Sequence, residues 1–180
     1  MSTNNCILIH YHELGLKGDN RKWFEQVFEN NVRKHLTGLP FSSVKTTGAR
    51  VFVFDVDSDQ WSDYSQRLKN VMGLANATLS SQIDPKIEIL NQTAEASFHD
   101  KIFDTFRVSA RRQYKNFPLT SMEINKQVGA HLWKIYKKKV QLKNPDLTCY
   151  IEIVNGMAYV GVDRISGYGG LPVGVSEKAV

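Results

Sequence analysis

Apolar and polar positions in the first half of the chain follow two periods in turn, one typical of strands and one typical of helices. Residues 6–11, CILIHY, form a short apolar run that predicts a buried strand. After a glycine-containing turn, apolar residues recur at helical spacing from Phe24 to Leu36, and Asp19 or Asn20 can cap that helix. Two strands, a second helix and a last strand are expected at residues 42–47, 50–56, 61–72 and 75–83. The order β-α-β-β-α-β predicts a ferredoxin-like domain, with two helices on one face of an antiparallel sheet.

The second half of the chain alternates differently. Helices and strands are expected at residues 86–99, 104–112, 120–138, 139–142, 147–154 and 157–163. Thr120 and Glu123 have the spacing of a capping box at the start of the longer helix. Asn155-Gly156 between two strand-like runs is a strong signal for a β-hairpin.

An α+β protein of two modules follows from these patterns. The Asp84-Pro85 pair marks the boundary between them. The predicted parts are a first domain, a second domain and a connector at residues 1–84, 85–165 and 166–180. The connector carries four glycines and one proline and has no period, so we expect it to lead into a further domain.

Composition excludes several classes of protein. No apolar run approaches the roughly 20 residues that a membrane span needs, and no signal peptide is recognised, so a cytoplasmic protein is expected. The two cysteines, Cys6 and Cys149, lie in separate apolar runs and are predicted to be buried thiols. The five histidines form no ligand cluster, and we expect no metal site and no bound cofactor in this chain.

Positive charge is concentrated in one segment. The net charge is +5, but residues 101–143 hold eleven Lys/Arg against two Asp/Glu. A local excess of this size suggests a footprint for an anionic partner. Strand alternation places Arg107 and Arg111 on one face, and Arg112 and Lys115 follow in the loop. Further candidate phosphate contacts are Lys126, Lys134, Lys137, Lys138, Lys139 and Lys143.

Two other features of this segment fit RNA. The helix start at Thr120–Glu123 offers backbone N–H groups and the positive end of a dipole to a phosphate. Tyr114 and Phe117 could stack on a base. The alternative is a solvated basic face with packed aromatic rings.

A second candidate phosphate contact lies in the first strand-to-helix turn. Lys17, Asn20 and Arg21 crowd a glycine-flanked turn there. The alternative is an ordinary capped turn with two surface cations. Neither the nucleotide phosphate-binding loop nor the dinucleotide fingerprint is present.

Three stretches resemble a known family. They are YHELGLKGDNRKWFE near the N-terminus, FRVSARRQYKNFPLTS in the basic segment, and the tail GYGGLPVGVSEKAV. Together they resemble the N-terminal portion of the bacterial 4-thiouridine synthetases, which are tRNA sulfurtransferases also linked to thiamine biosynthesis. The resemblance covers essentially the whole chain.

The resemblance implies a fold and a function. Residues 1–84 would be a ferredoxin-like domain and residues 85–165 a THUMP RNA-binding domain, which together hold tRNA. A catalytic domain after Val180 would adenylate uridine 8 with ATP and receive sulfur from a persulfide cysteine. The implied partners are tRNA, a cysteine desulfurase, a sulfur carrier protein and a second copy of the chain. This chain would bind tRNA without modifying it.

Other functions stay open on the sequence. A stand-alone THUMP adaptor for a separate modification enzyme would show the same residues. A small enzyme lacks support, because no nucleophile–base constellation or pair of carboxylates is present. A protein-interaction module is the remaining alternative.

Overall fold

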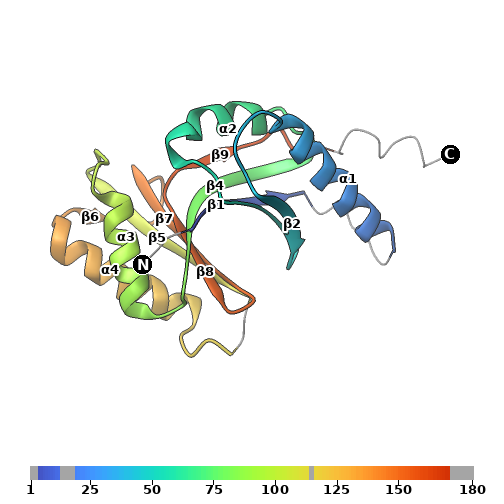
Figure 1. Cartoon of the computed structure of the whole chain (residues 1–180). Helices are drawn as coiled ribbons and strands as arrows, with labels where there is room; N and C mark the ends of the chain where they lie inside the picture. Colours follow the sequence, from blue (N-terminus) through green and yellow to red (C-terminus); the bar gives the residue numbers. More distant parts are fainter. Residues whose placement is uncertain (1–3, 13–18, 114–115, 171–180) are drawn as a thin grey trace. The chain divides into compact units, whose positions relative to one another are not determined.

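The computed structural model describes residues 4–12, 19–113 and 116–170. The chain forms two compact units (Figure 1). One is built from residues 5–79 together with the segment that starts at Arg164, and we call it the 5–79 unit. The other consists mainly of residues 80–163 and is called the 80–163 unit.

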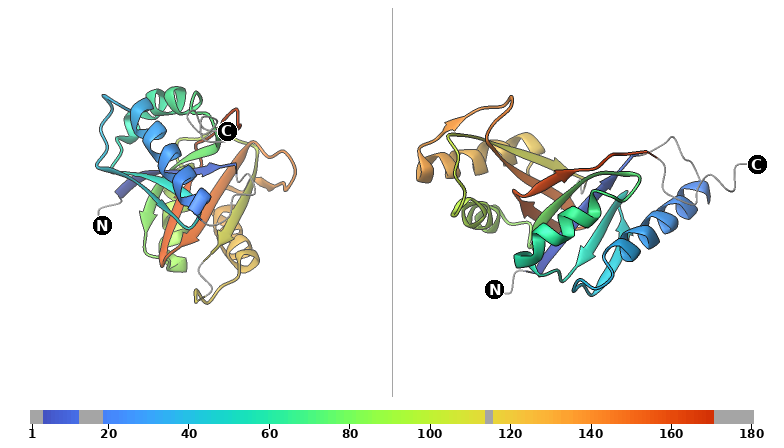
Figure 2. Two further views of the ribbon diagram at one scale, coloured as in Figure 1. Left: turned by 90° about the vertical axis from the view of Figure 1, so that its right-hand side faces the viewer. Right: turned by 90° about the horizontal axis from the view of Figure 1, so that it is seen from above.

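The 5–79 unit has the predicted β-α-β-β-α-β order. Its elements are β1 (Asn4–Tyr11), α1 (Asp19–His35), β2 (Ser43–Thr47), β3 (Arg50–Phe54), the short 3-10 helix η1 (Ser58–Gln60), α2 (Trp61–Leu68), the first part of β4 (Leu74–Ile83), and β9 (Arg164–Ser166). The strand order is β2-β3-β1-β4, and β9 pairs with β4 on Asn76, Ala77 and Thr78. The two helices cover one face of this sheet (Figure 2).

Helix α1 is held by an apolar stripe at helical spacing. Phe24, Phe28, Val32 and Leu36 are all buried and pack with the β1 side chains Ile7 and Ile9. The spacing of three and four residues puts them on one side of the helix, which explains why this stretch could be recognised from sequence.

The 80–163 unit combines two helices with a mixed sheet. Its elements are the end of β4, α3 (Ile87–Phe98), β5 (Thr105–Arg112), α4 (Ser121–Tyr136), β6 (Lys139–Val140), β7 (Leu147–Val154) and β8 (Met157–Gly161). The strand order is β4-β8-β7-β5-β6, with β5 parallel to both β7 and β6. Helices α3 and α4 lie side by side (Figure 1) and share one core with β5, β7 and β8.

The predicted hairpin is confirmed. Strands β7 and β8 are antiparallel, with Val154 opposite Met157. Asn155 and Gly156 both have positive φ, 49° and 77°, as a type I′ turn requires. The expected strand at 139–142 is shorter than predicted, because only Lys139 and Val140 pair with β5.

Both cysteines are buried and neither forms a disulfide. Burial raises the pKa of the Cys6 thiol to about 12, with a smaller contribution from Asp55, and burial alone raises the pKa of Cys149 to about 12. The prediction of two buried thiols is confirmed. Among the described residues no group of three or more metal-ligating side chains occurs, and no described helix is long and apolar enough to cross a bilayer.

Residues 167–170 pack against the start of β4 within the 5–79 unit. Gly169 accepts from the Gly73 amide at 2.9 Å and donates to the Leu74 carbonyl at 3.1 Å, and Gly167 donates to the Ala75 carbonyl at 3.0 Å. A Cβ on Gly167 would lie 2.2 Å from the Leu74 carbonyl oxygen, and one on Gly169 would lie 2.8 Å from the His12 ring. These glycines therefore permit close packing. The rest of the predicted connector lies outside the described residues.

Candidate nucleic-acid interface

Strand β5 shows the alternation that the sequence predicted. Phe106, Val108 and Ala110 are buried in the core shared with α3 and α4. Arg107 and Arg111 point to the other face, where Arg107 is partly buried and Arg111 is exposed. The period of two along a strand explains the separation.

Arg107 holds a loop in place. Its Nη1 donates to the Leu142 carbonyl at 2.9 Å, and its Nε donates to the Thr148 hydroxyl at 3.2 Å. Leu142 and Lys143 lie in the segment between β6 and β7, and Lys139 belongs to β6 itself. The guanidinium predicted to contact RNA thus fixes the backbone on which those two exposed lysines stand.

Arg112 plays a similar part on the loop before α4. Its Nη1 donates to the carbonyls of Phe117 and Leu119, at 2.8 and 3.2 Å. The side chain of Arg111, one residue earlier, is exposed and makes no hydrogen bond or ion pair with another described residue. Arg112 therefore holds a loop, whereas Arg111 stays available to a ligand.

Phe117 is a correction to the sequence interpretation. Its side chain is only 6% exposed and belongs to the hydrophobic core of the 80–163 unit. An apolar ring in that position gains more from burial than from water contact, so it is not available as an exposed stacking surface. Tyr114 and Lys115 lie outside the described residues.

The start of α4 is closed by the predicted capping box. The Glu123 carboxylate accepts from the Thr120 amide at 2.7 Å and from the Thr120 hydroxyl at 2.8 Å, and the Glu123 amide donates to that hydroxyl. These bonds, the backbone one first, lower the pKa of Glu123. A fixed negative charge thus occupies the positive end of the helix, which weakens it as a site for an RNA phosphate.

The lysines after β5 divide between exposed and engaged groups. Lys126, Lys134, Lys139 and Lys143 are exposed. Lys137 ends α4 in a left-handed conformation, and its Nζ lies 4.6 Å from the centroid of the Trp133 ring. Lys138 donates to Asp104 Oδ1 at 2.9 Å.

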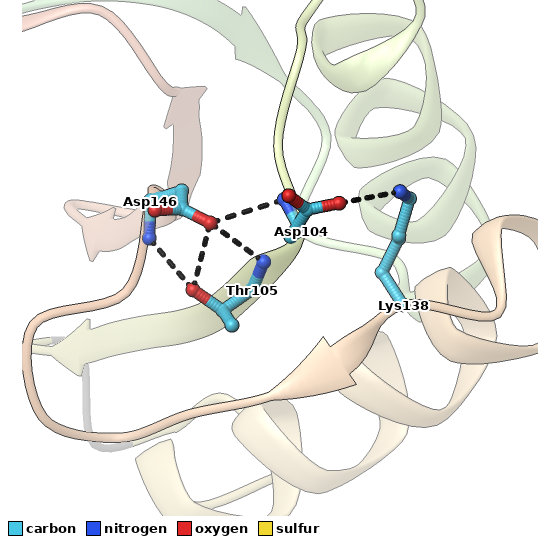
Figure 3. A network of polar contacts seen from close by, with 4 residues as sticks. All are labelled: Asp104, Thr105, Lys138 and Asp146. Atoms are coloured by element: carbon cyan, nitrogen blue, oxygen red, sulfur yellow. Dashed lines mark hydrogen bonds and ion pairs between the residues drawn. The ribbon is translucent and has the colours of Figure 1, made fainter.

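The Lys138–Asp104 pair belongs to a larger polar network (Figure 3). Asp146 Oδ2 accepts from the amides of Asp104 and Thr105 and from the Thr105 hydroxyl, at 3.0, 2.9 and 3.0 Å. The two backbone bonds and then the hydroxyl lower the pKa of Asp146. The network ties the start of β5 to the segments before β6 and β7, which fixes the turn that carries the lysines.

The candidate turn in the 5–79 unit is only partly described, because Lys17 lies outside the described residues. Asn20 is exposed in the first turn of α1. Arg21 donates from Nε to Glu25 Oε1 at 2.9 Å, and the Tyr11 hydroxyl donates to the same oxygen at 2.5 Å. Burial, followed by the bond to Glu25, raises the pKa of Tyr11. The sequence interpretation missed Tyr11 and Glu25, although Glu25 stands four residues after Arg21 on the helix.

Two family models match the chain. One, described as the ThiI ferredoxin-like domain, matches residues 6–78, and the other, described as the THUMP domain, matches residues 86–163. The chain therefore belongs to the class of proteins that join a ThiI ferredoxin-like domain to a THUMP domain, as its sequence motifs and fold class had indicated.

Relatives that match nearly the whole chain are described as probable tRNA sulfurtransferases. The chain is 33% identical to a probable tRNA sulfurtransferase of Thermococcus kodakarensis over 98% of its length, and 35% identical to one of Moorella thermoacetica over 97%. It spans just under half of these relatives, 48% and 44% respectively.

Two solved structures share the fold. PH1313 from Pyrococcus horikoshii superposes with a TM-score of 0.86 at 32% identity, covering 96% of this chain and 58% of that one. A 4-thiouridine synthetase–RNA complex with bound ATP gives 0.79 at 29% identity, covering 96% of this chain and 44% of that one.

Proposed function

We propose that this chain is the tRNA-binding region of a tRNA sulfurtransferase that makes 4-thiouridine at position 8. The observation that carries the proposal is the set of exposed cations on the THUMP domain: Arg111, Lys126, Lys134, Lys139 and Lys143. Arg107 and Asp146 hold the segments around Lys139 and Lys143 in place. Fixed cations of this kind suit a phosphate backbone. A relative crystallised with RNA supports the same ligand.

The rest of the function rests on the relatives, which are about twice as long as this chain. We propose that ATP-dependent activation of uridine and persulfide sulfur transfer take place in a catalytic domain outside these residues. A cysteine desulfurase, a thiamine-pathway sulfur carrier, a homodimer and a cytoplasmic location belong to the same proposal. The length of the relatives favours it over a stand-alone THUMP adaptor.

Charge reversal at Arg111 tests the proposal. Arg111→Glu should weaken tRNA binding about tenfold and reduce the slope of log K against log salt by roughly 1, because one phosphate contact is lost. Arg111 is preferred to Arg112 because Arg112 also holds a loop. Filter binding or fluorescence anisotropy across a salt series measures both quantities.

Lys69→Glu is the matched control, because Lys69 is exposed at the end of α2 and the change in net charge is the same. The control should leave tRNA affinity within about twofold, since the contact is local and net charge acts only weakly at physiological salt. Equal losses for both variants, or equal affinity of the chain for heparin and tRNA, would reduce the proposed site to nonspecific charge attraction.

A further inference from the structure

Several apolar side chains at the end of α4 and in the segment after it are exposed. Trp133 is 49% exposed, and Ile135, Val140 and Leu142 are also exposed. The stretch from Trp133 to Lys143, WKIYKKKVQLK, contains five lysines and no acidic residue. This combination of positive charge and apolar surface fits an anionic partner.

Trp133 does not belong to the buried stripe of α4, so core packing does not explain why a tryptophan stands there. Helix α4 buries Ile124, Val128 and Leu132 on one side. Trp133 follows Leu132 and is turned about 100° around the helix from it, so its indole lies away from that stripe. A half-exposed indole is a large apolar surface left in water, and such surfaces commonly mark a contact.

Lys137 gives the indole a charged companion. Its backbone N–H closes α4 on the Trp133 carbonyl, and its left-handed conformation turns the chain at that point. The ammonium lies 4.6 Å from the ring centroid, within the range of a cation–π contact. Lys134 is the next residue along the helix and is exposed. One cation therefore lies at the flat apolar ring, and a second is next to it along the chain.

We propose that Trp133, with Lys134 and Lys137, forms a stacking site for an unpaired nucleotide of bound RNA. The proposal rests on the tRNA-binding function and names a contact within it. A base stacks on the indole, and its phosphate is held by the ammonium groups, which is the combination that single-stranded nucleic-acid sites use. Charge favours RNA over a basic protein segment, because no carboxylate lies in this stretch to pair with such a partner.

No other described aromatic residue of the 80–163 unit is exposed to this extent. Phe117 is buried, and Tyr136 donates its hydroxyl to the Glu95 carbonyl at 2.9 Å while its ring packs against Phe98 and Phe103. Trp133 is the one exposed aromatic side chain among the described residues of this unit.

The test compares RNAs that differ only in unpaired nucleotides. Three probes are used: tRNA, a blunt RNA duplex, and the same duplex with a short single-stranded tail. Trp133→Ala should weaken binding to tRNA and to the tailed duplex about tenfold and leave the blunt duplex unchanged. Trp133→Phe keeps a stacking ring and should retain most of the affinity. The tRNA should quench the indole fluorescence of the wild-type chain more than that of Trp133→Phe.

Ile135→Ala is the matched control, because Ile135 is exposed two residues further along the same helix. It should bind all three probes as the wild type does, and thermal melts should show that every variant is folded. If Trp133→Ala binds tRNA normally, or loses the blunt duplex equally, the stacking site is refuted. If Ile135→Ala loses as much, the surface is a general apolar contact, as a protein partner would use, and the proposal is also refuted.

The two proposals fail in different ways. A wild-type chain that does not bind tRNA overturns the proposed function itself. A chain that binds tRNA, weakens with Arg111→Glu and is indifferent to Trp133→Ala overturns only the stacking site.

Discussion

The loops of the 80–163 unit and the glycine-rich segment of the 5–79 unit are held by opposite means. In the first, charged side chains bond to backbone groups: Arg107 donates to the Leu142 carbonyl, and the Asp146 carboxylate accepts from the Asp104 amide. In the second, Gly167 and Gly169 bring backbone directly against backbone. In the 80–163 unit the charged side chains therefore hold the chain's own backbone. In the 5–79 unit the glycines allow two backbone segments to pack closely.

The difference bears on how residue types are interpreted. A cluster of arginines suggests a ligand, and a run of glycines suggests a flexible linker. Here two of the arginines serve the chain's own backbone, and two of the glycines form ordered hydrogen bonds. Residue type alone therefore does not determine the role. What determines it is whether a hydrogen-bond partner within the chain lies close to the residue.

The largest expected effect on stability is that of a substitution at Gly167. Gly167→Ala would place its Cβ against the Leu74 carbonyl, which cannot move without disturbing β4, so we expect a loss of about 3 kcal/mol or more in the free energy of unfolding. Chemical denaturation measures it.

Gly129→Ala is the counterpart in the 80–163 unit. Gly129 lies inside α4, and its Cβ would lie 3.9 Å from Val108 Cγ2 of β5, an ordinary contact, so alanine should stabilise the chain by about 0.5–1 kcal/mol. The same substitution thus has opposite signs in the two units. A Gly167→Ala chain as stable as the wild type would show that residues 167–170 do not dock on β4.

The next largest effect on stability is expected at Arg112, and it distinguishes this residue from Arg111. Arg112→Ala leaves the carbonyls of Phe117 and Leu119 without this donor and should cost about 1–2 kcal/mol of stability. Arg111→Ala should change stability by less than about 0.5 kcal/mol but should weaken tRNA binding. Urea unfolding and tRNA titration of both variants give the comparison.

Arg112→Lys refines that comparison, because it keeps the charge and loses the forked geometry of the guanidinium. It should be less stable than the wild type and should keep the salt slope of tRNA binding. Equal stability of all three variants would mean that Arg112 does not hold the loop.

Local patterns in the sequence were enough to predict most elements. The buried alternation of β5, the Thr120–Glu123 box and the Asn155-Gly156 turn depend on residues within a few positions of one another, so each was predictable. The same holds for the outward position of Arg111.

Partners that are distant in sequence could not be predicted in this way. Arg107 bonds to a carbonyl 35 residues away, and β9 returns to pair with β4 after the whole 80–163 unit. Phe117 has the composition of a surface loop around it and is buried because the fold closes over it. Periodicity carries no information on such contacts, since they depend on how elements far apart in the chain are placed.

A smaller effect is expected at the carboxylate shared by Tyr11 and Arg21. Tyr11→Phe removes one hydrogen bond to Glu25 while Arg21 stays paired with it, so we expect a loss of about 1 kcal/mol in stability. If the pair also orients Arg21 for RNA, Tyr11→Phe should weaken tRNA binding a few-fold. That loss should vanish in an Arg21→Ala background, whereas additive losses would assign the hydroxyl a purely structural role.

The smallest effect is the pH dependence of the Asp146 network. The pKa of Asp146 is lowered in the folded chain, so its contribution to stability is present above its unfolded pKa, near 4, and is lost as the pH falls through the lower folded value. Asp146→Asn removes this titration and one charge, so it should melt slightly below the wild type at pH 6–7, and the gap should narrow below pH 4. Asp59→Asn, at an exposed aspartate of η1, is the control and should show no such narrowing. A gap that is constant down to pH 2 would mean that hydrogen-bond geometry, and not the charge on Asp146, holds the start of β5.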